Sequence, residues 1–260
     1  MKYNQSDIEY LKKYINENNL DDNYYNDCLK ELEQGRPIQY IIGNVDFYGN
    51  IIKVNPSVLI PRFETELLVD LTIKKIKNIF KDKKIDILDL GTGSGCIAIT
   101  LKKETNSNVD ALDISTDALD LAKINAKENN TEINFINKDM TIYKDKKYDV
   151  IISNPPYIRY DEEIMDIVKN NEPHLALYAE DEGLHFYKEI IKNIPNITKD
   201  KFLVCFEIGE SQGTAIVDIA KEYLKDINIS VQKDYSDKDR FVFITNESKN
   251  EFWLIFLFKK

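Results

Sequence analysis

Ile87-Leu88-Asp89-Leu90-Gly91-Thr92-Gly93-Ser94-Gly95 is the stretch that decides the fold of this 260-residue chain. Its first half is apolar apart from one carboxylate, which predicts a buried strand. Its second half carries three glycines, which allow a tight turn and a close approach of the backbone to a ligand. A helix is expected over residues 95–103, and its first backbone N–H groups are free to bind. The stretch therefore predicts a strand, a binding loop and a helix, the opening unit of an α/β sheet.

Strand and helix patterns alternate after this unit. Apolar runs predict seven strands, at residues 85–90, 108–113, 134–137, 149–153, 202–208, 227–233 and 240–245. Helices are expected between them, at residues 95–103, 117–129, 183–193 and 212–225. Such alternation predicts a parallel, doubly wound α/β sheet, but the short polar loop 234–239 makes the last two strands antiparallel. A sheet of this kind is similar to that of many S-adenosylmethionine (SAM) methyltransferases, more than to a dehydrogenase sheet.

Two smaller regions precede the sheet. Residues 1–36 predict a helical N-terminal region of two helices, with Ser6 as N-cap and Gly35 ending the second helix. Residues 37–62 predict a connecting β-hairpin that turns at Gly49-Asn50, and a helix is expected over residues 64–80. The methyltransferase domain then covers residues 63–245, and residues 246–260 form a tail. The six apolar residues 253–258 are too few to span a bilayer, and predict an extra packed strand or helix.

Charge and cysteine content argue against several classes of protein. Asp and Glu number 45 against 35 Lys and Arg, a net charge of −10 spread along the chain. Nucleic-acid and anionic-membrane binders need a basic surface, so neither direct nucleic-acid binding nor membrane binding is expected. Cys28, Cys96 and Cys205 are far apart in apolar surroundings, which is typical of reduced core residues in a cytoplasmic protein. His174 and His185 lack metal-ligand neighbours, so no metal is expected.

The glycine spacing indicates which cofactor the loop binds. It reads G-x-G-x-G, with Cys96 where a dinucleotide-binding G-x-G-x-x-G loop has its last glycine. A pyrophosphate favours the longer spacing, whereas a nucleoside without phosphates tolerates the shorter one. Asp89 would repel a diphosphate but suits the cationic amino-acid part of SAM. We therefore favour SAM over a dinucleotide, and a tight turn without any ligand is the other interpretation. The contacts expected from the loop are Gly91, Thr92, Gly93, Ser94 and Gly95.

Three residues extend the predicted cofactor site. Asp113 ends the next strand, about 20 residues after the glycines, where a carboxylate can accept hydrogen bonds from both ribose hydroxyls. Asp139 and Met140 follow the strand at 134–137. Asp139 can accept from the adenine amino group, and Met140 can pack on the adenine ring. The alternative for this segment is an ordinary solvated loop.

Asn154-Pro155-Pro156-Tyr157 follows another buried strand, at the end of the sheet where ligands bind. Its two prolines fix φ and remove two backbone donors. The Asn154 side chain and the Pro155 carbonyl then form a rigid pair of acceptors for a planar NH2 group, beside the Tyr157 ring. Acceptors on both N–H groups would orient an amide and favour charge developing on its nitrogen. Asn154, Pro155 and Tyr157 are the predicted catalytic residues.

In these motifs and several others, the chain resembles the release factor glutamine methyltransferases. The tetrapeptide alone is shared with adenine-N6 methylases, whereas the Ile60-Pro61-Arg62 segment is far more specific. The shared segments, in chain order, are residues 35–43, Phe47-Tyr48-Gly49, Leu59-Ile60-Pro61-Arg62, Glu64-Thr65-Glu66, the glycine loop, the tetrapeptide, Glu172-Pro173, Glu207-Ile208-Gly209, Gln212-Gly213, Asp234-Tyr235 and Asp239-Arg240.

The resemblance implies an enzyme that transfers a methyl group from SAM to a side-chain amide nitrogen. The implied target is N5 of the glutamine in the Gly-Gly-Gln motif of class I peptide chain release factors. The glycine loop, Asp113, a residue near Met140, and Asn154 would hold SAM. Arg62 and Glu66 would shape the substrate mouth, although acidic residues there also suit a helix N-terminus. The implied substrate-binding residues are Asn154, Pro155, Pro156, Tyr157, Arg62 and Glu66.

The chain departs from this family in three places, and two other functions compete with the implied one. Phe63 stands where the family has proline, the N-terminal helical region is short, and residues 246–260 are added. An adenine-N6 nucleic-acid methyltransferase would use the same tetrapeptide but must flip a base and grip phosphates. A non-catalytic adaptor with a SAM-binding fold would bind a partner without methyl transfer. A dehydrogenase is disfavoured by both the glycine spacing and the tetrapeptide.

Overall fold

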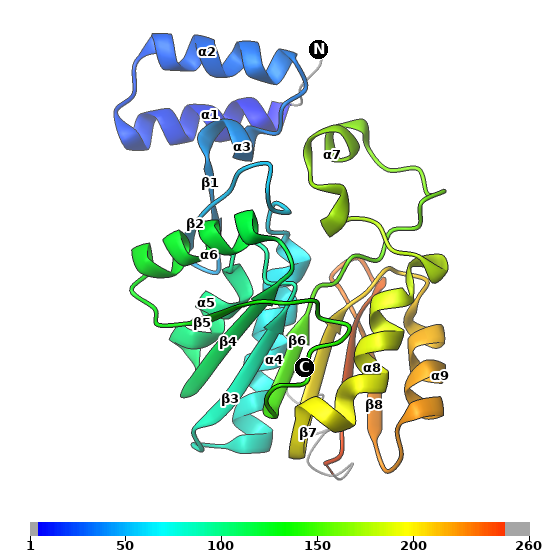
Figure 1. Ribbon diagram of the computed structural model, residues 1–260. Coiled ribbons are helices and arrows are strands. Elements are labelled where there is room, and N and C mark those ends of the chain that lie inside the picture. The colour runs from blue at the N-terminus through cyan, green and yellow to red at the C-terminus, as the bar shows by residue number, and fades with distance from the viewer. Residues whose placement is uncertain (1–4, 248–260) are drawn as a thin grey trace, which may run out of the picture.

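A seven-stranded sheet forms the centre of the molecule (Figure 1). The computed structural model describes residues 5–247. Across the sheet the strands follow the order β5-β4-β3-β6-β7-β9-β8. Neighbours from β5 to β7 are parallel, whereas β9 is antiparallel to both β7 and β8. The strands are β3 (Ile85–Leu90), β4 (Ser107–Asp113), β5 (Asn134–Asn137), β6 (Tyr148–Ser153), β7 (Thr198–Glu207), β8 (Asn228–Lys233) and β9 (Asp239–Thr245).

This arrangement confirms the predicted doubly wound sheet with an antiparallel last hairpin. All seven predicted strands are present, and their bounds shift by a few residues. The largest shift is in β7, which starts at Thr198 rather than at residue 202. Its first part pairs Thr198 with Tyr148 before an irregularity in the register, so the polar residues that follow Thr198 still belong to the strand.

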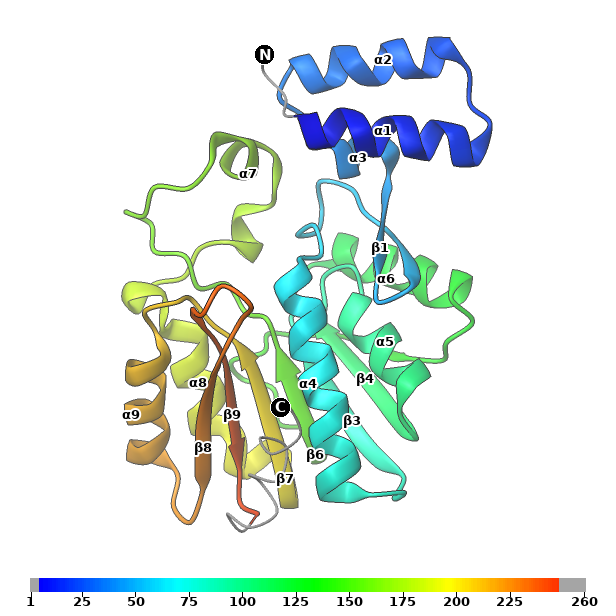
Figure 2. The same ribbon diagram turned by 180° about the vertical axis from the view of Figure 1, so that it is seen from behind.

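Helices cover both faces of the sheet because its side chains are apolar on both faces. Successive residues of a strand point to opposite faces, so Ile85 and Ile87 of β3 join one core cluster and Leu88 and Leu90 join the other. The first cluster lies under α4, α5 and α6, and the second under α8 and α9 (Figures 1 and 2). These helices are α4 (Phe63–Phe80), α5 (Cys96–Glu104), α6 (Thr116–Glu128), α8 (His185–Ile197) and α9 (Gly213–Tyr223).

The N-terminal helices form a small cluster of their own, joined to the sheet domain by the hairpin (Figure 2). They are α1 (Gln5–Asn18), α2 (Asp22–Glu33) and α3 (Ile38–Ile42), packed around Leu11, Cys28 and Leu32. Gly35 follows α2 with a φ of +82°, as expected of a residue that ends a helix. The prediction of Ser6 as N-cap was wrong, because α1 already includes it. The short helix α3 was not predicted.

The predicted hairpin is present as β1 (Asn44–Phe47) and β2 (Asn50–Lys53), but its turn lies one residue earlier than expected. Phe47 pairs with Asn50, so the two turn residues are Tyr48 and Gly49 rather than Gly49 and Asn50. Both have positive φ, +54° and +73°. Such a turn matches the twist of the flanking strands, which makes it favourable even with a tyrosine in the first position.

The part of the chain between the tetrapeptide and α8, residues 158–182, was not predicted to contain helices. It carries α7 (Asp166–Asn171) and the 3-10 turns His174–Ala176 and Asp181–Gly183. Asn171 Nδ2 donates to the Gly35 carbonyl at 3.0 Å, so this connection touches the N-terminal helices. Glu172 accepts a hydrogen bond from the Ile60 N–H at 3.0 Å and pairs with Arg62, so it also holds the segment that leads into α4.

Some sequence predictions lie at or beyond the ends of the described chain. The apolar run 253–258, predicted as an extra strand or helix, lies outside residues 5–247. Within that range no helix is both long enough and apolar enough to cross a bilayer. Cys28, Cys96 and Cys205 are all buried and unpaired. The boundaries at residues 36, 62 and 245 stay predictions.

Candidate active site

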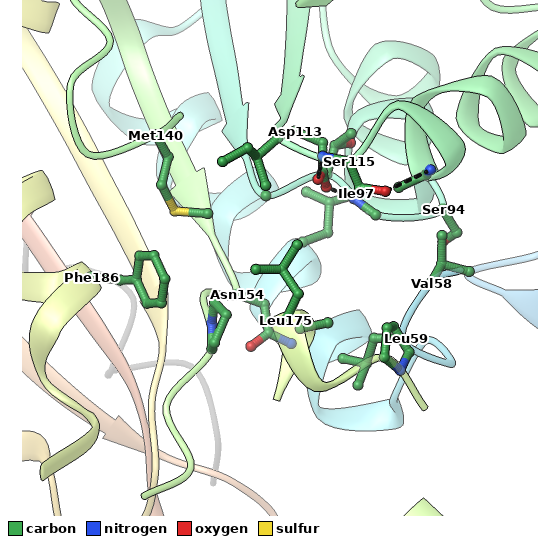
Figure 3. A pocket seen from close by; sticks show the side chains of 18 of the residues that line it. Val58, Leu59, Ser94, Ile97, Asp113, Ser115, Met140, Asn154, Leu175 and Phe186 are labelled. Carbon is green, nitrogen blue, oxygen red and sulfur yellow. Dashed lines mark hydrogen bonds between the residues drawn. The ribbon is translucent and has the colours of Figure 1, made fainter. Parts of the chain in front are cut away.

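A cavity of about 330 Å³ lies at the carboxyl ends of β3, β4 and β6, the edge of an α/β sheet that binds ligands (Figure 3). Met140, Phe186 and Asn154 lie along one side of it, and Asp113 and Ser115 along another. Nine residues predicted as cofactor or substrate contacts line the cavity: Gly91, Thr92, Gly93, Ser94, Asp113, Asp139, Met140, Asn154 and Pro156.

The glycine loop is tied to the end of β4. The N–H groups of Gly91 and Thr92 donate to the Leu112 carbonyl at 2.8 and 2.9 Å. The Gly93 N–H donates to Asp113 Oδ2 at 2.8 Å. Gly91 has a φ of +73°, and a Cβ there would stand 2.9 Å from Met140 Cε. Only glycine therefore lets the loop adopt this shape and pass this close to the cavity wall.

Gly95, a predicted cofactor contact, lies beside the helices rather than in the cavity wall. It precedes α5 with a φ of +82°, and a Cβ there would stand 3.2 Å from the Ala122 Cβ. The third glycine is therefore needed for the close packing of α5 on α6, because the chain turns away from the cavity at this point.

Asp113 and Asp89 place two carboxylates beside the loop. Asp113 Oδ1 accepts from the Ser115 N–H at 2.9 Å, and burial raises the pKa of its carboxyl. Asp89 is completely buried and accepts from the Thr92 hydroxyl through Oδ2 at 2.6 Å. Its other oxygen, Oδ1, has no hydrogen-bond partner among the described residues. Burial, opposed by the Thr92 hydrogen bond and reinforced by the charge of Asp113, raises the pKa of Asp89 to about 7.

These features fit the binding of SAM. Asp89 lies behind the glycine loop, held by the Thr92 hydroxyl, and a carboxylate at this place favours a ligand that carries a cationic group. Met140 is 8% exposed and lines the cavity together with Asp139, whose Oδ1 accepts from the backbone and hydroxyl of Thr141 at 2.8 and 2.7 Å. An apolar surface beside a carboxylate is what an adenine ring needs.

The tetrapeptide brings the Asn154 amide to the cavity wall. The preceding residue, Ser153, donates its hydroxyl to the Leu90 carbonyl at 2.7 Å, which joins the ends of β6 and β3. Asn154 Nδ2 donates to Thr65 Oγ1 at 3.2 Å, and the Thr65 hydroxyl donates to Glu207 Oε2 at 2.7 Å. One of the two N–H groups of Asn154 Nδ2 thus bonds within the protein, and this contact leaves the amide oxygen able to accept from a ligand.

Besides Gly95, four predicted site residues do not line this cavity: Pro155, Tyr157, Arg62 and Glu66. Tyr157 instead lines a second, polar cavity of about 550 Å³ together with Gln212 and Arg240. Gln212 Nε2 donates to the Tyr157 carbonyl at 3.1 Å and so fixes the end of the tetrapeptide. Arg62 is paired with Glu172, whose side chain is 1% exposed.

Glu66, predicted at the substrate mouth, points away from this cavity toward the hairpin. Its carboxylate accepts from the Tyr48 backbone N–H in the hairpin turn. Successive residues of a helix point about 100° apart, so it is Thr65, one residue earlier in α4, that lines the cavity. The shared segment Glu64-Thr65-Glu66 pointed to this region, but no local pattern favours Thr65 over its neighbours.

Several residues in and behind the cavity wall were not predicted from sequence. Glu207 does not line the cavity but is the buried partner of Thr65, and it was quoted only as part of a shared segment. His185 lines the cavity, and no group of three potential metal ligands occurs within residues 5–247. The apolar lining residues could not be recognised from the sequence, because apolar residues at a binding site look the same as those in the core. They include Val58, Leu59, Ile97, Leu175 and Phe186.

Comparisons with known proteins agree with this site. Residues 65–175 match the family model described as "Methyltransferase small domain". A release factor glutamine methyltransferase from Bacillus subtilis is 43% identical over 217 residues, which cover 81% of this chain and 75% of the relative. Another, from Fusobacterium nucleatum, is 38% identical over 262 residues, covering 96% of this chain and 72% of the relative.

A solved structure shows the same fold at low sequence identity. A methyltransferase from Pyrococcus furiosus superposes with a TM-score of 0.57 at 15% identity, over 77% of this chain and 91% of that one. The fold class is therefore confirmed independently of the motifs. Together with relatives of about 40% identity over most of their length, these findings show that the chain belongs to the family of release factor glutamine methyltransferases.

Proposed function

We propose that this protein transfers a methyl group from SAM to the N5 amide nitrogen of the glutamine in the Gly-Gly-Gln motif of class I peptide chain release factors. One observation carries the proposal. Asn154 lies in the wall of the cavity that the glycine loop forms, and its Nδ2 is already bonded to Thr65. Its Oδ1 would therefore be the atom that accepts from a donor such as an amide NH2 in the cavity.

Residues of the first cavity would hold the cofactor. Gly91 to Ser94 supply a close backbone, Asp113 would accept from the ribose, and Asp139 and Met140 would contact the adenine. Asp89 would compensate the positive charge of the cofactor from behind the loop. When bound, SAM supplies an electrophilic methyl group, and the protein supplies position and charge.

Asn154 and Pro155 would act on the glutamine. An amide nitrogen is a weak nucleophile because its lone pair is delocalised. Asn154 Oδ1 and the Pro155 carbonyl would accept from its two N–H groups, which orients the nitrogen for in-line attack. The same hydrogen bonds strengthen as positive charge develops on nitrogen. Pro156 and Tyr157 would confine the side chain, and Arg62 would keep the entry segment in place through Glu172.

We further propose a protein target, without direct nucleic-acid binding, and a cytoplasmic site of action. The net charge of −10 supports the first point, because phosphate contacts need basic surface. Three unpaired, buried cysteines support the second. An adenine-N6 methyltransferase would instead label a nucleic acid with a strong salt dependence, and an adaptor would bind SAM without any transfer.

Mass spectrometry of a release factor incubated with the protein and SAM tests the proposal. We expect a gain of one methyl group, mapped to the glutamine of Gly-Gly-Gln. A release factor with that glutamine replaced by alanine is the matched control and should gain nothing. Methylation of oligonucleotides but not of the release factor would contradict the proposal in favour of the nucleic-acid alternative.

A further inference from the structure

We propose that Thr65 and Glu207 are positioning residues that set which way round the Asn154 amide faces the target. This inference rests on the proposed function of Asn154. An asparagine side chain presents an acceptor on one side and a donor on the other, and the two have nearly the same shape. Only the acceptor can receive a hydrogen bond from a glutamine NH2, so an enzyme of this kind needs a device that selects one orientation.

The fold brings the two residues and Asn154 together. β6 and β7 are parallel neighbours that pair Ser153 with Phe206. Asn154 and Glu207 therefore stand side by side at adjacent strand ends. Thr65, in the first turn of α4, lies between them and is 3% exposed, and Glu207 is 2% exposed. The hydrogen bonds run from Asn154 Nδ2 to Thr65 Oγ1 (3.2 Å) and from Thr65 to Glu207 Oε2 (2.7 Å).

The charge of Glu207 fixes the direction of both hydrogen bonds. A carboxylate can only accept, so the single hydroxyl proton of Thr65 goes to it. The Thr65 oxygen then accepts from Asn154 Nδ2, which leaves Asn154 Oδ1 for the target. A protonated Glu207 can donate to Thr65 instead. The Thr65 proton is then free to bond Asn154 Oδ1, and the amide would turn its NH2 toward the NH2 of the target.

The surroundings of Glu207 place the protonation of its carboxylate, and with it the turn of the Asn154 amide, near neutral pH. Burial, opposed by the Thr65 hydrogen bond and the charge of Arg240, raises its pKa to about 7. Among the described residues no lysine or arginine forms an ion pair with it, because Arg62 is paired with Glu172 and Arg240 with Asp234. The titratable and charged groups that act on Glu207 are Arg62, Glu64, Cys96, Tyr157, Tyr187 and Arg240. Methyl transfer should therefore fall as the pH drops below about 7.

Two variants test the relay by kinetics. Thr65→Val removes the hydroxyl at nearly constant volume and should lower kcat about 10- to 100-fold, the size of effect expected for a misplaced catalytic group. Glu207→Gln places an NH2 against Thr65 and should lower kcat similarly while removing the change near pH 7. Both should leave the Kd for SAM within about twofold. Thr65→Ser, which keeps the hydroxyl, should restore most of the lost rate. Thr72→Val, about two turns further along α4 and away from the cavity, is the matched control.

A readout that does not depend on transfer separates this inference from the proposed function. The Asn154 side-chain NH2 resonances, assigned by their loss in Asn154→Asp, should shift between pH 6 and 8 in the wild-type protein. They should not shift in Glu207→Gln. Resonances that shift equally in both proteins, or in neither, would overturn the relay whatever the activity. A relay that passes this test while no release factor is methylated would contradict the proposed function alone.

Discussion

The two ends of the central sheet carry the same kind of residue in opposite electrostatic states. At the amino ends of the strands, Asp86 and Asp149 share Lys199, whose Nζ lies 2.7 Å from an oxygen of each. At the carboxyl ends, Asp89, Asp113 and Glu207 have no lysine or arginine partner among the described residues. The difference arises within the sheet, because the polar amino end of β7 supplies Lys199, whereas no strand of the described chain supplies a lysine or arginine partner at the carboxyl ends.

The pKa values record this difference. Burial would raise the pKa of Asp86, but hydrogen bonds from Lys199 and Asn108 and the nearby lysine charges outweigh it and lower the pKa to about 2. Burial dominates for Asp89 and Glu207 and raises each pKa to about 7. The amino end is therefore built for stability, whereas the carboxyl end keeps carboxylates at a cost in stability, as functional sites do.

The largest expected effect belongs to the carboxyl end. Asn154→Ala should reduce methyl transfer to a release factor by about 10²- to 10³-fold, because it removes an acceptor that strengthens in the transition state. SAM binding, measured by calorimetry, should stay within about tenfold. An equal loss of SAM binding and methyl transfer would mean that Asn154 is mainly a cofactor contact. Asn154 would then not be a catalytic residue of the carboxyl end.

The pH dependence of unfolding should show the two ends separately. A carboxyl whose folded pKa is raised stabilises the fold below its unfolded pKa, near 4. For Asp89 and Glu207 that contribution should be lost as the pH rises from about 4 to about 7, by an amount on the order of a few kcal/mol. Asp86 has a lowered pKa, so its contribution should be present above about pH 4 and lost toward pH 2.

Urea unfolding of the ligand-free protein between pH 3 and 8 measures both pH-dependent changes in stability. Asp89→Asn should reduce the loss of stability between pH 4 and 7. The separate loss of stability below about pH 4, which depends on Asp86, should not change. A variant with the same slope as the wild type would show that Asp89 is ordinarily ionised in the folded protein, and the contrast between the two ends would fail.

Asp113→Ala should weaken SAM binding by about 1–3 kcal/mol, the usual cost of leaving hydroxyl groups of a buried ligand unpaired. Asp86→Ala, the matched change at the amino end of the neighbouring strand, should leave the dissociation constant for SAM unchanged. Calorimetric titration of both variants with SAM tests these two expectations. Unchanged affinity in Asp113→Ala would move the ribose contact elsewhere in the cavity.

The smallest effect is expected at the amino end. Lys199→Met should lower the free energy of unfolding by about 1 kcal/mol, because half-exposed ion pairs contribute little even when one lysine serves two carboxylates. Urea unfolding at pH 7 measures the change, and methyl transfer should not respond. A substantial loss of transfer in this variant would show that the two ends of the sheet are coupled.

Local patterns were sufficient to predict much of the carboxyl end. The apolar strand with its glycine loop, Asp113, Met140 and Asn154 were all predicted, and the structure gathers them around one cavity. Errors arose where a local pattern allowed two answers. Tyr48 adopts a positive φ, so the hairpin turn lies one residue earlier than predicted. The helical period of α4 directs Thr65, rather than Glu66, toward the cavity. Gly95 was predicted to touch the ligand but packs on Ala122.

The sheet, the cofactor loop and the tetrapeptide follow from the amino-acid sequence alone, because each depends on residues close together in the chain. The orientation of Asn154 depends instead on contacts that form only when the chain folds. Its partner Thr65 lies 89 residues away, and Glu207 lies 142 residues beyond Thr65. These contacts exist because the strand order sets β7 beside β6, and because α4 packs on the face of the sheet with its first turn at the carboxyl ends of these strands. A hydrogen bond needs its atoms within about 3 Å, and the folded arrangement of distant segments meets that condition.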